Sequence, residues 1–447
     1  MKRVLSICVL VLSINISHAQ AQGWRVGTSA VKITPEKPIP LVGYASRTNA
    51  FKTVDQDIYA QGLALQDESG NRALLVTADI CILSPTVAEP ICDELMAKTG
   101  LKREQILLSV SHTHSGPWVA LAPSRALNLP ESLTNDVVEY TRVFQKKLVE
   151  AGTGALAKLA PAKISYGTGA ANFVMNRREL TTNGVILGVN PRGYVDRTVP
   201  ALRIDSLEGE LRAVVFGYAC HGTTLPSDSL IISGDYPGYA REEIRKKYPA
   251  AEALFVAGLG GSANPYPRTG IDFAKQHGAE LAAEVCRVLE SKLRPIRGSL
   301  TCVHENAELP LEVLSKEELT ETAKTKRWLR GPAEDMIKAL EIGETLPRVH
   351  KAPVSIWQFG ADLTLVALSG EVVGEYVPMI EQAIGPMNLW LAAYCNAVSG
   401  YIPTRQTLRE GGYECRGLYE GLGWYAPEAE KVLVDKVKAL AVRAGRK

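Results

Sequence analysis

Residues 73–117 read ALLVTADICILSPTVAEPICDELMAKTGLKREQILLSVSHTHSGP, and this stretch decides the fold class. Residues 73–80 form an apolar run rich in β-formers, which is typical of a buried strand. Residues 84–98 have the apolar spacing of a helix, and Gly100 marks its end. Residues 106–110 are a second short apolar run. The order strand, helix, strand indicates a parallel strand pair and an α/β protein.

The rest of the chain continues this alternation. Two apolar runs with no helix between them, 354–359 and 363–367, favour an antiparallel hairpin, so we expect mixed β-sheets flanked by helices. Internal repeats and low-complexity segments are not apparent. The other expected strands are 211–219, 254–257 and 389–393, and the other expected helices are 271–293, 427–443 and one from about Tyr239.

Composition and charge exclude several classes of protein. The chain has 447 residues with 50 Lys and Arg against 48 Asp and Glu, a formal net charge of +2. Such a balance argues against a nucleic-acid-binding surface spread over the chain. Hydrophobic residues make up 46%, which is ample for a packed core and argues against disorder. Eight cysteines in this length are too sparse for a disulfide scaffold, and a buried thiol is the expected state of most.

The N-terminus has the pattern of an export signal. A basic start, Lys2 and Arg3, precedes an apolar stretch and a small-residue exit ending at Ala19. This predicts a signal peptide over 1–19, since the stretch is shorter than the ~20 residues of a membrane anchor, the alternative. We therefore expect a periplasmic or extracellular protein without a transmembrane segment. We expect one catalytic domain over 23–447, in which the charged region near 310–350 is either an excursion or a lobe boundary.

Histidines follow two of the expected strands. His112 and His114 come directly after the strand at 106–110, and His221 follows the strand at 211–219. In an extended chain, side chains at i and i+2 point the same way, so both imidazoles of the first pair should lie together. Ligands bind at the carboxyl edge of an open α/β sheet, and imidazole nitrogen suits Zn²⁺. The pair is thus compatible with a metal site, and two polar loop residues are the more common interpretation of this spacing alone.

Other polar residues also follow expected strands. Glu371 comes after an apolar run and precedes a helix, where its carboxylate can ligate a metal or interact with the helix dipole. The run 255–265, FVAGLGGSANP, ends in a glycine-rich turn that lacks the GK[ST] ending of a P-loop. Backbone amides of such a turn can form an anion-binding nest.

Taken in order, several short motifs resemble the neutral/alkaline non-lysosomal ceramidase family of zinc-dependent amidases. Each motif is weak alone, but their order over residues 26 to about 425 is specific. They are VGTSA at 26–30, ITP at 33–35, HTHSGP at 112–117, NR at 176–177, HGT at 221–223, SGD at 233–235, GE at 370–371, GYIPT at 400–404 and YE at 413–414.

The resemblance implies a catalytic zinc and a set of residues around it. Matched by motif, the zinc ligands are His112, His221, Glu371 and Tyr401. Zinc lowers the pKa of its bound water towards ~7, and the resulting hydroxide attacks the amide carbonyl. Oxyanion stabilisation or proton relay is implied for three further residues, which are His114, Arg177 and Tyr413.

Three departures from the family pattern limit the substrate assignment. Ceramidases carry Gly-Asp-Val-Ser-Pro at the glycine-rich turn, whereas here Asn264 stands at the Ser position and Ser262 at the Asp position. Asn264 can orient a water or donate a hydrogen bond but cannot accept an acyl group, and Ser262 is a minor candidate nucleophile. Trp118 replaces a small residue and should reshape the pocket. The chain is also expected to lack the family's C-terminal immunoglobulin-like domain.

The sequence thus predicts a secreted zinc-dependent hydrolase that cleaves an amide bond of a small-molecule or lipid substrate, with ceramide as the model. One alternative is a zinc hydrolase of the same fold that acts on a carbohydrate- or cell-wall-derived amide or ester. A non-catalytic binding protein is a second alternative, and the complete set of four ligands counts against it.

Overall fold

The computed structural model describes residues 23–44, 47–122 and 130–446. Its larger sheet has nine strands in the order β12-β10-β9-β6-β1-β3-β4-β5, and β14 pairs with β6. Parallel and antiparallel pairs both occur, because β4 and β5 run parallel while β1 and β3 run antiparallel. The strands are β1 (Trp24–Lys32), β3 (Tyr59–Gln66), β4 (Arg72–Ala78), β5 (Ile106–Val110), β6 (Ala160–Ala170), β9 (Thr198–Asp205), β10 (Leu211–Tyr218), β12 (Glu252–Ala257) and β14 (Arg294–Ile296).

A four-stranded sheet packs against the larger one. Its order is β15 (Leu300–Pro310), β16 (Val349–Phe359), β17 (Leu363–Leu368) and β19 (Leu389–Ala392). The hairpin predicted from the runs 354–359 and 363–367 is present as the antiparallel pair of β16 and β17. One hydrophobic cluster joins the facing sides of the two sheets, for example Trp24 on β1 with Phe359 on β16. Alternate strand residues point to opposite faces, so the other side of each sheet is left for helices.

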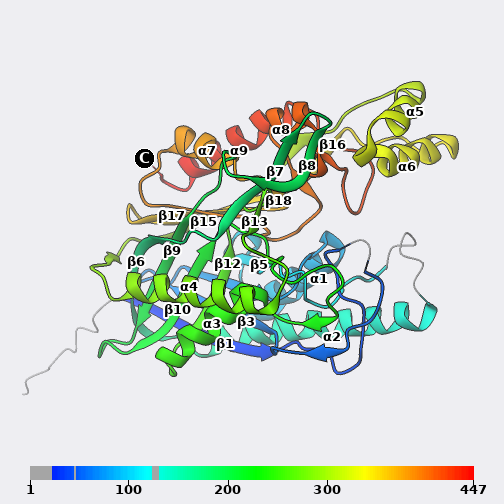
Figure 1. The fold of residues 1–447 in the computed structure, drawn as a ribbon. Coiled ribbons are helices and arrows are strands. Elements are labelled where there is room, and N and C mark those ends of the chain that lie inside the picture. The colour runs from blue at the N-terminus through cyan, green and yellow to red at the C-terminus, as the bar shows by residue number, and fades with distance from the viewer. Residues whose placement is uncertain (1–22, 45–46, 123–129, 447) are drawn as a thin grey trace, which may run out of the picture.

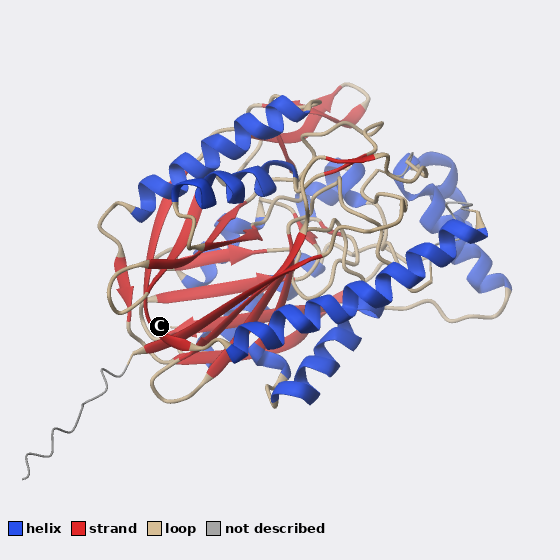
Figure 2. Cartoon of the chain, turned by 90° about the horizontal axis from the view of Figure 1, so that it is seen from below, coloured by secondary structure: helices blue, strands red, loops and turns tan. Residues whose placement is uncertain are grey.

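Helices cover both outer faces, and the molecule is a four-layer α/β/β/α sandwich (Figures 1 and 2). The α/β fold with mixed sheets flanked by helices is therefore confirmed. On the larger sheet lie α1 (Pro85–Thr99), α2 (Glu131–Ala157), α3 (Asp235–Lys247) and α4 (Ile271–Leu289), and on the smaller sheet lie α7 (Tyr376–Ile384) and α9 (Ala429–Arg443).

Three strand–helix–strand units direct their carboxyl ends to one region. The parallel pairs are β4 and β5 around α1, β10 and β12 around α3, and β17 and β19 around α7. Because carboxyl ends of parallel strands share an edge, the segments that follow them meet there. Figure 2 shows loops gathered at that end of the strands.

Short elements complete this end of the molecule. The hairpin of β7 and β8 carries β13 on its edge, and the two-residue strands β18 and β20 pair in parallel. Helices α5 and α6 project from the body and share a small cluster with Trp424 (Figure 1). These elements are β2 (Thr53–Val54), β7 (Val174–Thr181), β8 (Gly184–Asn190), β11 (Ile231–Ile232), β13 (Ala263–Pro265), β18 (Glu371–Val372), β20 (Tyr401–Ile402), α5 (Lys316–Thr325), α6 (Arg330–Glu341), α8 (Arg405–Glu410) and the 3-10 turns Arg103–Gln105, Arg327–Leu329 and Tyr413–Cys415.

Some sequence-based boundaries need correction. Helix α3 begins at Asp235, four residues before the expected Tyr239, and Pro237 in its first turn was the available signal. Glu371 does not begin a helix, since it lies in β18 and α7 starts only at Tyr376. Among the described residues no helix has the length and apolarity needed to cross a membrane. The signal peptide expected over 1–19 lies outside the described residues.

Candidate metal centre

Two histidines are oriented so that the same ring nitrogen of each points to one spot. His112 follows β5 and His221 follows β10. The Nδ1 atom of His112 lies 2.7 Å from the carbonyl oxygen of Cys81, and that of His221 lies 2.8 Å from the carbonyl oxygen of Gly260. A carbonyl oxygen only accepts, so both Nδ1 atoms donate. The Nε2 atom of each ring is then the nitrogen that carries the lone pair, which is the usual arrangement of metal-ligating imidazoles.

Glu371 completes a three-atom cluster with these nitrogens. Its Oε2 atom lies 3.1 Å from Nε2 of His112 and 3.0 Å from Nε2 of His221. All three side chains are buried, and Oε2 has no hydrogen-bond partner among the described residues. A buried carboxylate oxygen without a donor is costly unless a cation is present. Two imidazole nitrogens and one carboxylate oxygen suit Zn²⁺, so these residues fit the ion that the sequence predicted.

Tyr401 lies beside the cluster as a fourth candidate ligand. The parallel pairing of β18 and β20 places Tyr401 opposite Glu371. Its hydroxyl oxygen is 3.3 Å from Nε2 of His221 and accepts a hydrogen bond of 2.9 Å from Nη2 of Arg177. Burial raises the pKa of Tyr401 well above its ordinary value, although the nearby Arg177 lowers it.

His112 and His114 approach each other, but not in the extended geometry expected from the sequence. His112 has a φ of 57°, so the chain turns at this residue and the premise of an extended strand is wrong. The two Nε2 atoms nevertheless lie 3.2 Å apart. Burial and then the neighbouring His112 lower the pKa of His114 well below its ordinary value, which keeps its ring neutral. Nδ1 of His114 is buried and has no partner among the described residues.

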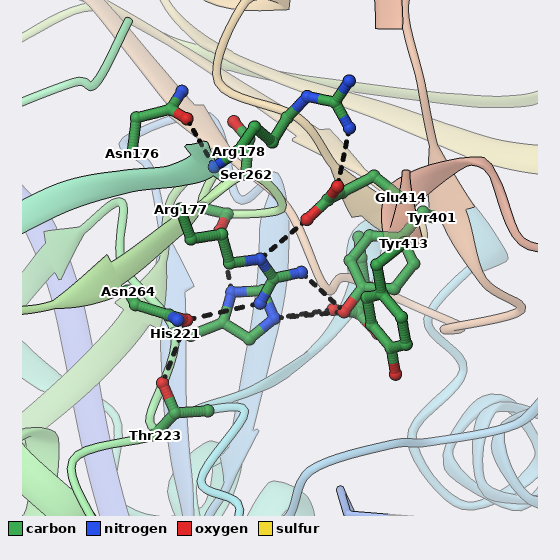
Figure 3. Close-up of polar contacts among 12 residues, drawn as sticks. Asn176, Arg177, Arg178, His221, Thr223, Ser262, Asn264, Tyr401, Tyr413 and Glu414 are labelled. Atoms are coloured by element: carbon green, nitrogen blue, oxygen red, sulfur yellow. Dashed lines mark hydrogen bonds and ion pairs between the residues drawn. The ribbon is translucent and has the colours of Figure 1, made fainter. Parts of the chain in front are cut away.

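Arg177, a buried residue of β7, links three segments of the site (Figure 3). Nε donates to Oε1 of Glu414 at 2.8 Å, and Nη1 donates to Oδ1 of Asn264 at 3.3 Å. With its hydrogen bond to Tyr401, the guanidinium of Arg177 has three side-chain partners. Asn264 also accepts from the hydroxyl of Thr223 at 3.1 Å. The hydrogen bonds of the described residues leave the amide nitrogen of Asn264 unused.

Tyr413 stands next to Tyr401 with its hydroxyl proton available. The two rings meet edge to face at 5.5 Å, and Arg177 lies 5.7 Å from the centre of the Tyr413 ring. The hydroxyl oxygen accepts from Nη1 of Arg416 at 2.7 Å, which leaves its own proton free to be donated. Trp328, in the turn between α5 and α6, packs edge to face against the outer side of Tyr413 at 5.2 Å.

The glycine-rich turn serves close packing, and four of its backbone N–H groups are already hydrogen-bonded, those of Gly258, Gly260, Gly261 and Ala263. The backbone N–H of Gly261 donates to the carbonyl of Val372, and that of Gly260 to the carbonyl of Gly258. A Cβ on Gly261 would lie 2.6 Å from the carbonyl oxygen of Glu371, and one on Gly260 would lie 2.8 Å from the nitrogen of Cys220. The glycines therefore let the segments that carry His221 and Glu371 approach each other.

The hydroxyl of Ser262 makes its hydrogen bonds outside the cluster of candidate metal ligands. Its hydroxyl donates to Oε2 of Glu375 at 2.9 Å and accepts from the backbone N–H of Gly374 at 3.1 Å. Burial raises the pKa of Glu375. These contacts join the glycine-rich turn to the start of α7.

Several residues at the site were not singled out from the sequence. Glu414, quoted only as part of the YE motif, has no exposed surface, and its two oxygens accept from Arg177 and Arg178. The ring of Tyr394 stacks on His112 at 4.3 Å. Asp235, part of a quoted motif, accepts from the backbone N–H groups of Thr224, Leu225 and Tyr236 and so holds the segment after His221. No local pattern marks these contacts, because their partners are distant in sequence.

The bulky residue after the HTHSGP motif, Trp118, is half-buried and packs against the main hydrophobic core. Its backbone N–H donates to the carbonyl of Pro40 at 2.8 Å. All seven described cysteines are free thiols, and six of them are buried, as expected from the sequence.

Residues 24–298, more than half of the chain, match the model of a family described as neutral/alkaline non-lysosomal ceramidase, N-terminal. Among curated proteins, the neutral ceramidase of Pseudomonas aeruginosa is 25% identical over 248 residues, which is 53% of this chain and 36% of the relative. Neutral ceramidase B of Dictyostelium discoideum is 26% identical over 264 residues, 56% of this chain and 36% of the relative. The match thus spans little more than a third of the length of either relative.

Solved structures share the fold. The crystal structure of the Pseudomonas aeruginosa neutral ceramidase superimposes with a TM-score of 0.70 at 20% identity, covering 94% of this chain and 75% of that one. A ceramidase complexed with C2 gives a TM-score of 0.71 at 19% identity, covering 95% and 76%.

Proposed function

Because the chain belongs to the neutral/alkaline non-lysosomal ceramidase family, we propose that it is a zinc-dependent hydrolase that cleaves an amide bond. One observation carries this proposal. The buried Oε2 of Glu371 has no hydrogen-bond donor among the described residues, and it lies about equally far from two imidazole nitrogens whose lone pairs face it. A carboxylate so placed is stabilised by a cation held between the three atoms.

The zinc ligands of the proposal are His112, His221, Glu371 and Tyr401. When bound, zinc supplies a nucleophilic water near neutral pH and polarises the carbonyl of the substrate. The backbone carbonyls of Cys81 and Gly260 fix the orientation of the two imidazoles. The hydrogen bond that Tyr401 accepts from Arg177 stabilises negative charge on the tyrosine oxygen, which suits a ligand to a cation.

Four further residues act on the amide in this proposal. His114, whose buried Nδ1 atom has no hydrogen-bond partner among the described residues, can relay a proton to the leaving amine. Arg177 and Tyr413 both contact Tyr401 and can donate to the oxyanion that develops from the carbonyl. Asn264 can donate from its unused amide nitrogen to a water or to the substrate.

We further propose an N-acyl lipid such as ceramide as the substrate and export by a signal peptide as the route to it. The support for the substrate is that the similar curated proteins are neutral ceramidases and that one similar solved chain is a ceramidase complexed with C2. A carbohydrate- or cell-wall-derived amide or ester is the competing substrate class, and a non-catalytic binding protein is the competing function.

The test combines metal content with substrate release. We expect the purified protein to hold about one zinc per chain and to release amine from ceramide faster than from non-lipid amides. His112→Ala removes one of the four ligands and should lose both the zinc and the hydrolysis. His350→Ala is the matched control, because His350 is half-buried on β16 and its ring contacts only Tyr425 among the described aromatic residues.

Each outcome decides one part of the proposal. A protein that takes up no zinc contradicts the ligand assignment. Stoichiometric zinc without hydrolysis of any amide or ester contradicts the enzyme assignment and favours a binding protein. Release from a non-lipid amide or ester, but not from ceramide, keeps the zinc hydrolase and replaces the substrate class.

A further inference from the structure

One tyrosine outside the expected site contacts the candidate metal ligand Glu371 directly. The hydroxyl of Tyr419 donates to Oε1 of Glu371 at 2.5 Å. The other carboxylate oxygen, Oε2, is the atom that faces the two imidazoles. We propose that Tyr419 is a positioning residue that engages one oxygen of Glu371 and so presents the other to the metal. This inference rests on the proposed zinc site.

The ring of Tyr419 is fixed by contacts on several sides. Its backbone N–H donates to the carbonyl of Ser399 at 2.9 Å, which ties it to the segment leading into Tyr401. Its ring meets that of Tyr401 edge to face at 6.2 Å. The guanidinium of Arg416 lies 5.2 Å from the centre of the same ring. Cation–π and edge-to-face contacts of this kind favour one ring orientation, so the hydroxyl is held towards Glu371.

Arg416 connects this contact to the residue proposed to act on the substrate. It lies between two rings, 5.1 Å from the centre of Tyr413 and 5.2 Å from that of Tyr419, and its Nη1 donates to the hydroxyl of Tyr413. The short segment 413–419 therefore supplies both a group facing the carbonyl and a group supporting a metal ligand. In the described part of the chain no hydrogen bond joins Tyr419 to either imidazole, so its effect passes through Glu371.

The hydrogen bond has a defined consequence for metal binding. A carboxylate with one oxygen bonded to a neutral donor binds a cation through the remaining oxygen, in a fixed direction. Partners of this kind behind a metal ligand typically account for 10- to 100-fold in metal affinity or activity.

The test is the zinc dissociation constant of Tyr419→Phe, measured by competition with a chromogenic chelator. Phenylalanine keeps the ring and removes only the donor. We expect zinc to bind at least ~10-fold more weakly, by the magnitude usual for such partners, with the melting temperature of the zinc-free protein unchanged. Tyr140→Phe is the matched control, since Tyr140 is also half-buried and its hydroxyl donates to a backbone carbonyl, that of Ile33, at 2.6 Å.

The outcomes separate this inference from the function on which it rests. Unchanged zinc affinity in Tyr419→Phe, with normal zinc binding by the parent protein, overturns the positioning role alone. Equal weakening in Tyr419→Phe and Tyr140→Phe also overturns it, because the effect would then be general. A parent protein that binds no zinc contradicts the proposed function, and the positioning role falls with it.

Discussion

Arg177 is the residue whose hydrogen bonds join most of the site. Its guanidinium donates to Glu414, Tyr401 and Asn264 from three different nitrogens. Lysine keeps the charge but has no planar fork, so Arg177→Lys cannot make these bonds together. We expect kcat to fall by about 10²-fold, the usual loss for one oxyanion donor, while zinc content is retained. Steady-state kinetics and metal analysis check this.

A second arginine provides the comparison for that experiment. Arg203 on β9 is partly buried and bonded to Asp205, and it pairs with Val214, four residues before the end of β10. Arg203→Lys should leave kcat within about twofold of the parent value, since a partly exposed ion pair contributes little to the stability of the fold. Full activity of Arg177→Lys would contradict the role given to the guanidinium.

Ser262 allows a direct test of the minor alternative for the nucleophile. Its hydroxyl is bonded to Glu375 and to the backbone of Gly374. We expect Ser262→Ala to keep hydrolysis within about twofold and to lower the free energy of unfolding by ~1–2 kcal/mol, because the carboxylate of Glu375 loses a donor. Kinetics and urea unfolding measure the two effects. Loss of nearly all hydrolysis in a folded variant would restore Ser262 as the nucleophile.

At the scale of the element, the glycine-rich turn after β12 decides how closely the site segments approach. A Cβ on Gly261 would lie 2.6 Å from the carbonyl oxygen of Glu371 and 2.7 Å from that of Val372. Backbone atoms cannot move aside as a flexible side chain does, so we expect Gly261→Ala to lower stability by about 1–3 kcal/mol or more and to weaken zinc binding. Thermal unfolding and chelator competition check this.

Gly331 in α6 is the matched control for that substitution. It has open space where a Cβ would stand, and it lies within a helix. Gly331→Ala should therefore leave zinc binding unchanged and raise stability by up to ~1 kcal/mol through helix propensity. If Gly261→Ala left stability and zinc binding unchanged, the turn would have room for a Cβ atom and the close-approach argument would be wrong.

The strands and helices follow from local patterns, and the contacts between them do not. The run at 106–110 became β5 with the same bounds, because a short buried strand is encoded by its own apolar residues. The convergence of the histidines after β5 and β10 also follows from strand ends. By contrast, the left-handed turn at His112 depends on the packing around it. The bonds of Glu414 and Tyr419 join residues far apart in sequence, and no spacing rule specifies them.

At the scale of the whole molecule, the candidate metal centre joins the two sheets. His112 and His221 follow strands of the larger sheet, whereas Glu371 follows β17 of the smaller sheet. Tyr401 pairs with Glu371 through β18 and β20. A bound ion would therefore connect segments that belong to different layers. A single catalytic domain over 23–447 stays a prediction that agrees with this arrangement.

Zinc should therefore stabilise the folded protein as a whole. A ligand that binds only the folded state adds about 2.7 kcal/mol at a free concentration one hundred times its dissociation constant. We expect the melting temperature of the chelator-treated protein to rise with added zinc until saturation. Mg²⁺ prefers oxygen ligands in octahedral geometry, so it should not reproduce the rise. His221→Ala should abolish the zinc dependence, because it removes a ligand contributed by the larger sheet. A melting temperature that is independent of zinc in the parent protein would mean that the ion does not bridge the sheets in the folded state.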